Sequence, residues 1–197
     1  MVNDKTRFLF IHIPRTGGMS MREALLSIPN TKGTGHRSLF RNELIGRRTG
    51  NGTRKLGRRI SYFKFAFVRH PLDRLVSCWN RHTQINNMFN ENGKPIESFD
   101  YFIDKLASNE YTDKYRYTVV PMVNWLQDEN GKIDMEFIGR FENISNDWDS
   151  LAEQIGCEVP LPRKNNTRHK RWMKYFTPQS RRMIEDYYKE DMETFDY

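Results

Sequence analysis

The feature that most constrains the fold is a pair of glycines, Gly17 and Gly18, placed directly after an apolar run at residues 8–13. The apolar run has the length and composition of a buried strand, and residues 19–27 follow a helical pattern. Two glycines let the chain turn sharply and bring backbone N–H groups close to an anion, and the helix that follows adds the positive end of its dipole. The sequence therefore predicts a phosphate-binding loop between a strand and a helix.

A second strand–loop–helix unit follows later in the chain. Residues 63–68 are predicted to form a strand that ends in Arg69-His70-Pro71, and residues 71–82 are predicted to form a helix with proline at its start. The first loop lacks the Gly-Lys-Ser/Thr ending of a nucleoside triphosphatase, and Arg69 stands where such an enzyme needs a carboxylate for magnesium. A P-loop-like nucleotide kinase is therefore disfavoured, and Arg69 can recruit a second phosphate with no metal.

The segments FIHIPRTGGMS at residues 10–20 and FVRHPLDRLVSCW at residues 67–79 together resemble the sulfotransferases that use 3′-phosphoadenosine 5′-phosphosulfate (PAPS). The resemblance is to the carbohydrate, heparan-sulfate-2-O-type branch, and it includes FIGRFEN at residues 137–143 and the ending at residues 175–197. It implies an α/β fold with one P-loop-like domain over residues 1–197, in which a central parallel sheet is flanked by helices. It also implies transfer of a sulfuryl group from PAPS to an acceptor hydroxyl, with a carbohydrate as the expected acceptor and adenosine 3′,5′-bisphosphate (PAP) as the product.

The same resemblance assigns the donor site. The first loop would hold the 5′-phosphosulfate, with Arg15 stabilising the leaving phosphate, and Arg69 and Ser77 would hold the 3′-phosphate. The loop residues implied are Arg15, Thr16, Gly17, Gly18, Met19 and Ser20. The chain departs from the family at two positions: Arg15 replaces the usual lysine, and His70 replaces an acidic residue or asparagine. The guanidinium of arginine is a planar fork and the ammonium of lysine is compact, so the first replacement changes the geometry of contact with the leaving group. For Arg69 a structural ion pair, and for Ser77 a bond to its own helix backbone, remain alternatives.

The catalytic base should be a group with a pKa near neutrality within reach of the acceptor hydroxyl. His36 lies in a segment that follows the first helix, and family members with Gly-His at this place use the histidine as the base. We therefore predict that His36 is the base, with a solvated loop histidine as the alternative and Glu23 as the reserve base. His12, inside the first strand, is expected to orient the loop or to pack in the core.

Basic residues gather in two further segments. Residues 46–59 are predicted to form a mobile basic loop, and residues 86–97 an exposed insertion. The basic cluster at residues 163–171 has three open explanations: a lid over the 3′-phosphate, a groove for an acidic acceptor, or a solvated run. The first explanation makes Arg168 and Lys170 candidate donor ligands.

Composition bounds the partners that the chain can have. The chain has 197 residues, enough for one domain, with 32 Lys and Arg against 25 Asp and Glu and a formal net charge of +7. This balance favours anionic partners, and an anionic nucleotide donor such as PAPS, a polyanionic glycan, nucleic acid and an acidic membrane face would all qualify. Charge alone therefore does not distinguish the enzyme from a basic nucleic-acid-binding protein. A nucleic-acid binder has no need of a glycine turn behind a buried strand, so we expect the enzyme and no nucleic-acid partner.

The remaining sequence signals concern cysteines and targeting. Cys78 and Cys157 form neither a disulfide framework nor a zinc site, and no metal is expected. Residues 1–6 are polar and lead straight into the first strand, which leaves no room for a signal peptide or membrane anchor. A cytoplasmic protein with no membrane span, or a piece of a longer protein, is the resulting expectation.

Overall fold

The computed structural model describes residues 1–33, 35–36, 61–84, 98–108, 116–128, 130–162 and 171–197. They group into two compact units, one comprising Met1–Arg69 and Met122–Asn165 and the other His70–Pro121 and Asn166–Tyr197. The predicted basic loop at 46–59, the predicted insertion at 86–97, and Arg168 and Lys170 all lie outside the described residues.

The first unit is built on a five-stranded sheet with the order β3-β1-β2-β4-β5. Strands β2 (Phe8–Ile11), β4 (Phe63–Val68) and β5 (Phe137–Arg140) are parallel, which confirms the α/β class and its central parallel strands. Strands β1 (Val2–Asn3) and β3 (Thr31–Lys32) add antiparallel pairs, so the sheet is mixed. The first parallel strand ends two residues before the predicted limit, because the chain leaves the ladder after Ile11 to enter the loop.

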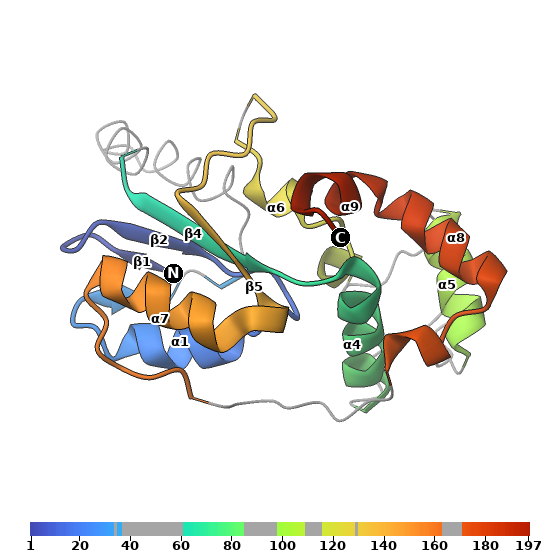
Figure 1. Cartoon of the computed structure of the whole chain (residues 1–197), viewed down its shortest axis with the longest axis horizontal. Coiled ribbons are helices and arrows are strands. Elements are labelled where there is room, and N and C mark those ends of the chain that lie inside the picture. The colour runs from blue at the N-terminus through green and yellow to red at the C-terminus, as the bar shows by residue number, and fades with distance from the viewer. Residues whose placement is uncertain (34, 37–60, 85–97, 109–115, 129, 163–170) are drawn as a thin grey trace. The chain divides into compact units, whose positions relative to one another are not determined.

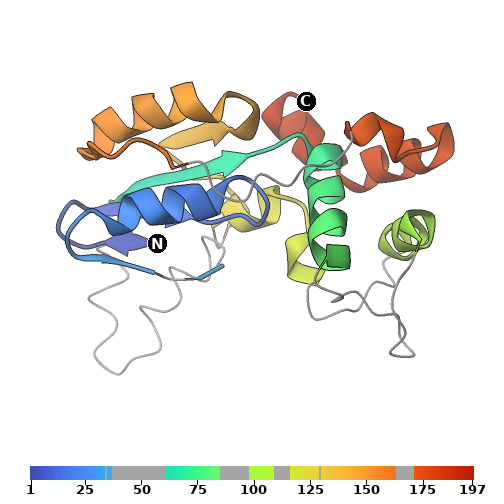
Figure 2. The same cartoon turned by 90° about the horizontal axis from the view of Figure 1, so that it is seen from below.

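Helices α1 (Gly18–Leu26) and α7 (Ile144–Ile155) cover one face of this sheet (Figures 1 and 2). Alternate side chains of a strand point to the same face, so the phenylalanines of β2 and β4 meet these helices as two rows. The buried residues of this core are Met1, Phe8, Phe10, Met21, Ala24, Leu25, Phe65, Phe67, Trp148, Leu151, Ala152, Ile155 and Cys157. Apolar burial on this face thus fixes the helix that begins at the glycine loop. The short helix α6 (Val123–Leu126) also belongs to this unit.

The second unit is helical. Helix α4 (Pro71–Gln84) starts at the proline that the sequence predicts. Helices α5 (Phe99–Ala107), α8 (Pro178–Tyr187) and α9 (Lys189–Phe195) also belong to this unit. Proline at the first position of α8 and a capping box formed by the preceding threonine fix where that helix begins. The buried residues of the core of the second unit are Leu72, Leu75, Cys78, Trp79, Phe102, Ile103, Leu106, Val119, Ile184 and Tyr188.

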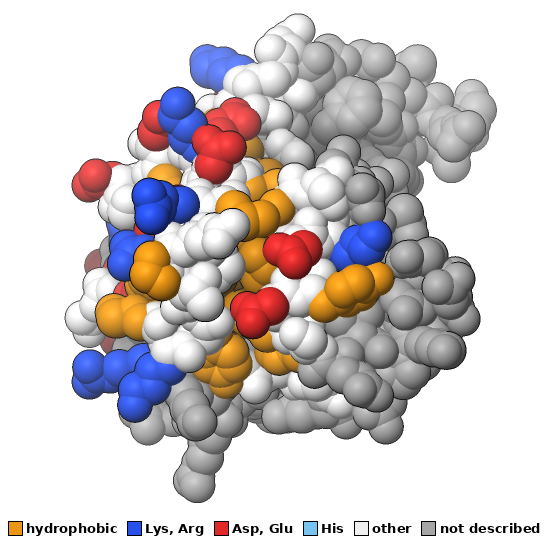
Figure 3. Space-filling model, turned by 90° about the vertical axis from the view of Figure 1, so that its right-hand side faces the viewer, with side chains coloured by type: hydrophobic (Ala, Val, Ile, Leu, Met, Phe, Trp, Pro, Cys, Tyr) orange, Lys and Arg blue, Asp and Glu red, His pale blue; other side chains and the backbone are white. Residues whose placement is uncertain are grey.

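The surface around α5 and α8 mixes apolar, acidic and basic side chains (Figure 3). Apolar atoms make up a large part of any folded surface, so this mixture alone indicates no partner.

No helix within the described ranges is long and apolar enough to cross a bilayer.

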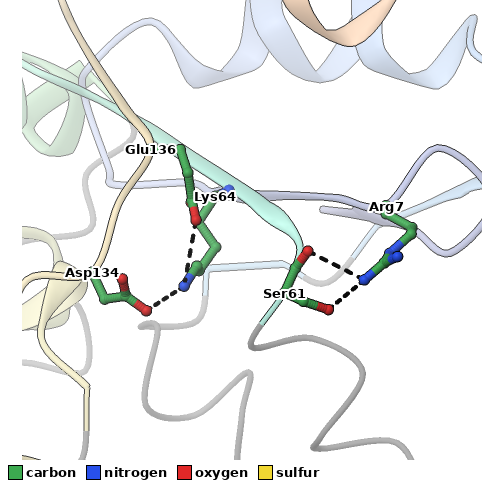
Figure 4. A network of polar contacts seen from close by, with 5 residues as sticks. All are labelled: Arg7, Ser61, Lys64, Asp134 and Glu136. Carbon is green, nitrogen blue, oxygen red and sulfur yellow. Dashed lines mark hydrogen bonds and ion pairs between the residues drawn. The ribbon is translucent and has the colours of Figure 1, made fainter.

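A buried lysine ties the centre of the sheet to the segment before β5 (Figure 4). Lys64 of β4 is only 1% exposed, and its ammonium pairs with Asp134 and lies 3.8 Å from Oε1 of Glu136. The backbone N–H of Lys64 donates to the Glu136 carboxylate at 2.6 Å, and the Glu136 N–H donates to the Lys64 carbonyl at 2.9 Å. Because a buried charge is tolerated only when it is paired, these contacts fix the segment that leads into β5. In the same view Arg7 donates to the carbonyl of Ser61 at 3.4 Å, just before β4.

Gly139 of β5 packs directly against the core. A Cβ atom there would lie 2.4 Å from the ring of Phe67, which is fully buried. We expect Gly139→Ala to lower the free energy of unfolding by about 1–3 kcal/mol through overpacking. Urea denaturation measures this, with Gly33→Ala as the control, since a Cβ at Gly33 meets no described atom within 4 Å. Equal stability of the two variants would contradict the packing argument.

Candidate active site

The loop between β2 and α1 contains two residues in the left-handed backbone conformation. Gly17 has φ 86° and Arg15 has φ 70°, both in the left-handed region. Glycine adopts this conformation at little cost, whereas a residue with a Cβ loses roughly 1–2 kcal/mol. The buried Thr16 helps to hold the loop, because its Oγ1 donates to the carbonyl of Ile13 at 3.0 Å.

The two glycines are also required by space. A Cβ at Gly17 would lie 2.5 Å from Cδ1 of Ile144 and 3.3 Å from the ring of Phe141, and a Cβ at Gly18 would lie 2.0 Å from the ring of His12. Gly18 is the first residue of α1, and the N–H of Ser20 in its first turn donates to the Gly17 carbonyl at 3.0 Å. The N–H groups at the very start of a helix have no partner within the helix. Such N–H groups and the dipole of the helix favour an anion at this end. Ser20, which is 6% exposed, lies in the same turn.

Arg69 meets the loop from the end of β4. It is 6% exposed, and its Nη1 donates to the carbonyl of Arg15 at 3.2 Å. Its guanidinium carbon lies 4.1 Å from the centroid of the Phe141 ring, which is a cation–π geometry. Arg69 is thus brought to the predicted phosphate loop, and its contact with a loop carbonyl supports the left-handed Arg15.

His36 lies beside the end of the strand that leads into the loop. Its Nδ1 is 3.0 Å from the carbonyl oxygen of His12, and the centroids of the two rings are 4.1 Å apart. A carbonyl only accepts hydrogen bonds, so this contact assigns the proton of a neutral His36 to Nδ1 and leaves Nε2 able to accept a proton. The His36 side chain is exposed, and the ring of Trp125 in α6 presents an edge at 6.4 Å.

His12 is buried where the strand passes into the loop. It is 6% exposed and stacks on Phe10 with centroids 5.6 Å apart, so the two expected roles, in the core and at the loop, coincide. Burial first, and then the charges of His36, the N-terminus and Arg22, lower the pKa of His12 from 6.5 to about 3. The unfolded chain therefore binds this proton more tightly. The stability that His12 contributes is complete above pH 6.5 and is lost as the pH falls from 6.5 toward 3.

The remaining predicted residues are spread more widely. Met19 is 46% exposed beside the loop, and Glu23 is exposed on α1. Ser77 is 1% exposed on α4 and belongs to the second unit.

Among residues that the sequence did not single out, Phe141 and Ile144 touch the loop. Phe141 stood in the family-like segment FIGRFEN, but nothing in that pattern indicated its neighbours.

Gly18→Ala tests the contact between the loop and His12. The added methyl group overlaps the His12 ring, so the loop or the ring must move. We expect binding of the predicted product nucleotide PAP to weaken at least about tenfold, because the loop N–H groups no longer point at the phosphate. Isothermal titration calorimetry measures this against Gly33→Ala. Unchanged affinity in Gly18→Ala would show that the loop does not bind the nucleotide.

Comparison with known protein families identifies the family of this chain. The family model described as "Sulfotransferase family" matches residues 1–197. Carbohydrate sulfotransferase 14 of Danio rerio is 26% identical over 184 residues, which are 80% of this chain and 48% of that protein. The chain thus spans about half the length of that relative. An uncharacterized protein of Archaeoglobus fulgidus is 25% identical over 115 residues, which are 57% of this chain and 85% of that protein.

A solved structure shares the fold. Mouse sulfotransferase SULT7A1, complexed with PAP, superposes with a TM-score of 0.55 at 15% sequence identity, covering 99% of this chain and 87% of that one. At this identity the likeness shows the fold alone. Since the family model covers the whole sequence and the α/β sheet agrees with it, the chain belongs to the sulfotransferase family and is a sulfotransferase.

Proposed function

We propose that this sulfotransferase moves a sulfuryl group from PAPS to an acceptor hydroxyl of a carbohydrate. The observation that carries the proposal is the hydrogen bond from Arg69 to the carbonyl of Arg15. It joins the residue proposed for the 3′-phosphate to the loop proposed for the 5′-phosphosulfate, and one nucleotide of this kind carries both groups. The mouse sulfotransferase of the same fold was solved in complex with PAP, which supports the choice of donor.

The donor site that we propose uses the first unit at two points. The N–H groups of the first turn of α1, the Ser20 hydroxyl and Arg15 bind the 5′ end, while Arg69 binds the 3′-phosphate. Hydrogen bonds between a guanidinium and phosphate oxygens are charge-assisted, so this arrangement needs no metal to neutralise the nucleotide. Ser77 stays a predicted donor ligand on the strength of the family resemblance. Arg168 and Lys170 stay candidate donor ligands under the lid explanation of the basic cluster at residues 163–171.

In the proposed reaction His36 is the general base. Its Nε2 takes the proton of the acceptor hydroxyl as the hydroxyl oxygen forms a bond to sulfur. The bond between sulfur and the bridging oxygen breaks, and its electron pair stays on the phosphate of PAP. Arg15 and the loop N–H groups stabilise that charge, and the proton on His36 then passes to solvent.

A carbohydrate acceptor is supported by the zebrafish relative, which is named as a carbohydrate sulfotransferase. The net charge of +7 is compatible with an acidic glycan but does not single it out among anionic partners. Sulfate transfer from PAPS to a panel of acidic glycans, small hydroxylated metabolites and tyrosine peptides tests this part of the proposal. Transfer only to the last two classes would contradict the carbohydrate acceptor and leave the donor chemistry standing.

Arg69→Ala tests the 3′-phosphate contact. We expect the affinity for PAP to fall by about 2 kcal/mol or more, as for the loss of a charge-assisted bond. Titration is carried out with a chelator present, and AMP, which lacks the 3′-phosphate, is the comparison ligand. A smaller loss for AMP is expected. An equal loss for both ligands would show that Arg69 only supports the loop, and binding abolished by the chelator would contradict metal-free recognition.

His36→Ala tests the base. A general base contributes about 10² to 10⁴ in rate, so turnover should fall by that factor while the affinity for PAP stays nearly unchanged. Glu23→Gln is the matched control, because Glu23 is the reserve base, and it should retain turnover if His36 takes the proton. Near-normal turnover of His36→Ala would remove His36 from the mechanism. A parallel fall in PAP affinity would make His36 a nucleotide ligand.

A further inference from the structure

We propose that the ring of His12 is a positioning element that holds the His36 ring beside the phosphate loop. The inference rests on the proposed function of His36 as the base. It goes further by naming the residue that places the base with respect to the donor.

The His12 ring is in contact on three sides. It stacks on Phe10 of β2, lies at 4.1 Å from the His36 ring, and fills the space beside Gly18. Phe10 in turn stacks on Phe65 with centroids 5.2 Å apart, so the ring rests on the sheet core. One buried side chain therefore touches the core, the start of the loop helix and the proposed base.

The position of the base depends on contacts that its ring makes. The His36 side chain is exposed, and Gly35 before it has φ 67° with no described atom within 4 Å of its Cβ position. The His36 ring contacts the carbonyl and the ring of His12, and it meets the edge of Trp125. A base must lie within hydrogen-bond reach of the proton that it takes, so loss of a packing surface for its ring lowers the population of the reactive geometry.

The chemistry also requires that this surface be uncharged. His36 becomes positively charged when it takes a proton, and a second charge 4.1 Å away would oppose that step. Burial and the nearby charges of His36, the N-terminus and Arg22 depress the pKa of His12 to about 3, so its ring is neutral near neutral pH.

Turnover of four proteins tests the proposal: the natural chain, His12→Ala, His36→Ala and the double variant. We expect His12→Ala to lower kcat by about tenfold to a hundredfold. The Kd for PAP should rise by a clearly smaller factor, because Thr16, Phe141 and Ile144 still hold the loop. If His12 acts through His36, adding His12→Ala to His36→Ala lowers kcat no further. A further loss in the double variant, or an equal loss of PAP affinity in His12→Ala, would overturn the proposal.

Two more variants separate positioning from general destabilisation. Leu9→Ala empties a buried position in the same strand, so it should lower the unfolding temperature and leave kcat unchanged below that temperature. His12→Leu fills a similar volume with a neutral side chain and should recover most of the turnover lost in His12→Ala. A Leu variant as slow as the Ala variant would overturn the packing argument. Near-normal turnover of His36→Ala would instead overturn the proposed base itself.

Discussion

The site depends on close packing around Gly17 and Gly18. The loop packs so closely against His12, Phe141 and Ile144 that no Cβ fits at either glycine. This packing holds Gly17 and Arg15 in left-handed conformations and aims the start of α1 at the place where an anion would bind. A looser loop would lose both the direction of its N–H groups and its contact with the neighbouring strand ends.

Parallel strands explain why residues far apart in the chain meet at this loop. In open sheets the carboxyl ends of parallel strands converge at one edge, where ligands bind. The glycine loop follows β2, Arg69 follows β4, and Phe141 follows β5. The Phe141 ring contacts both the Arg69 guanidinium and the space beside Gly17, so the third strand supports the elements that the first two supply. The buried ion pairs of Lys64 hold the segment that enters this third strand.

In the proposed site the histidine pair supplies the basic nitrogen. The predicted phosphate loop and Arg69 would neutralise the nucleotide, but they offer no group that accepts a proton near neutral pH. The carbonyl of His12 gives His36 the tautomer with an accepting Nε2, and the neutral ring of His12 lies against it. Family membership and this geometry together favour a sulfotransferase over the kinase and nucleic-acid-binding alternatives.

Local sequence patterns were enough to predict the glycine loop, the parallel strands β2 and β4, the place of Arg69 at the end of β4 and the start of α4. These features follow from apolar runs and from glycine and proline, whose effects are confined to a few residues. The two-residue strands β1 and β3 could not be predicted in this way, because they are too short to show a pattern. The contact of His36 with the carbonyl of His12, 24 residues earlier, could not be predicted from local patterns either. The same holds for the position of Arg69 between a loop carbonyl and the ring of Phe141. Such contacts depend on how distant segments pack, and no local periodicity records them.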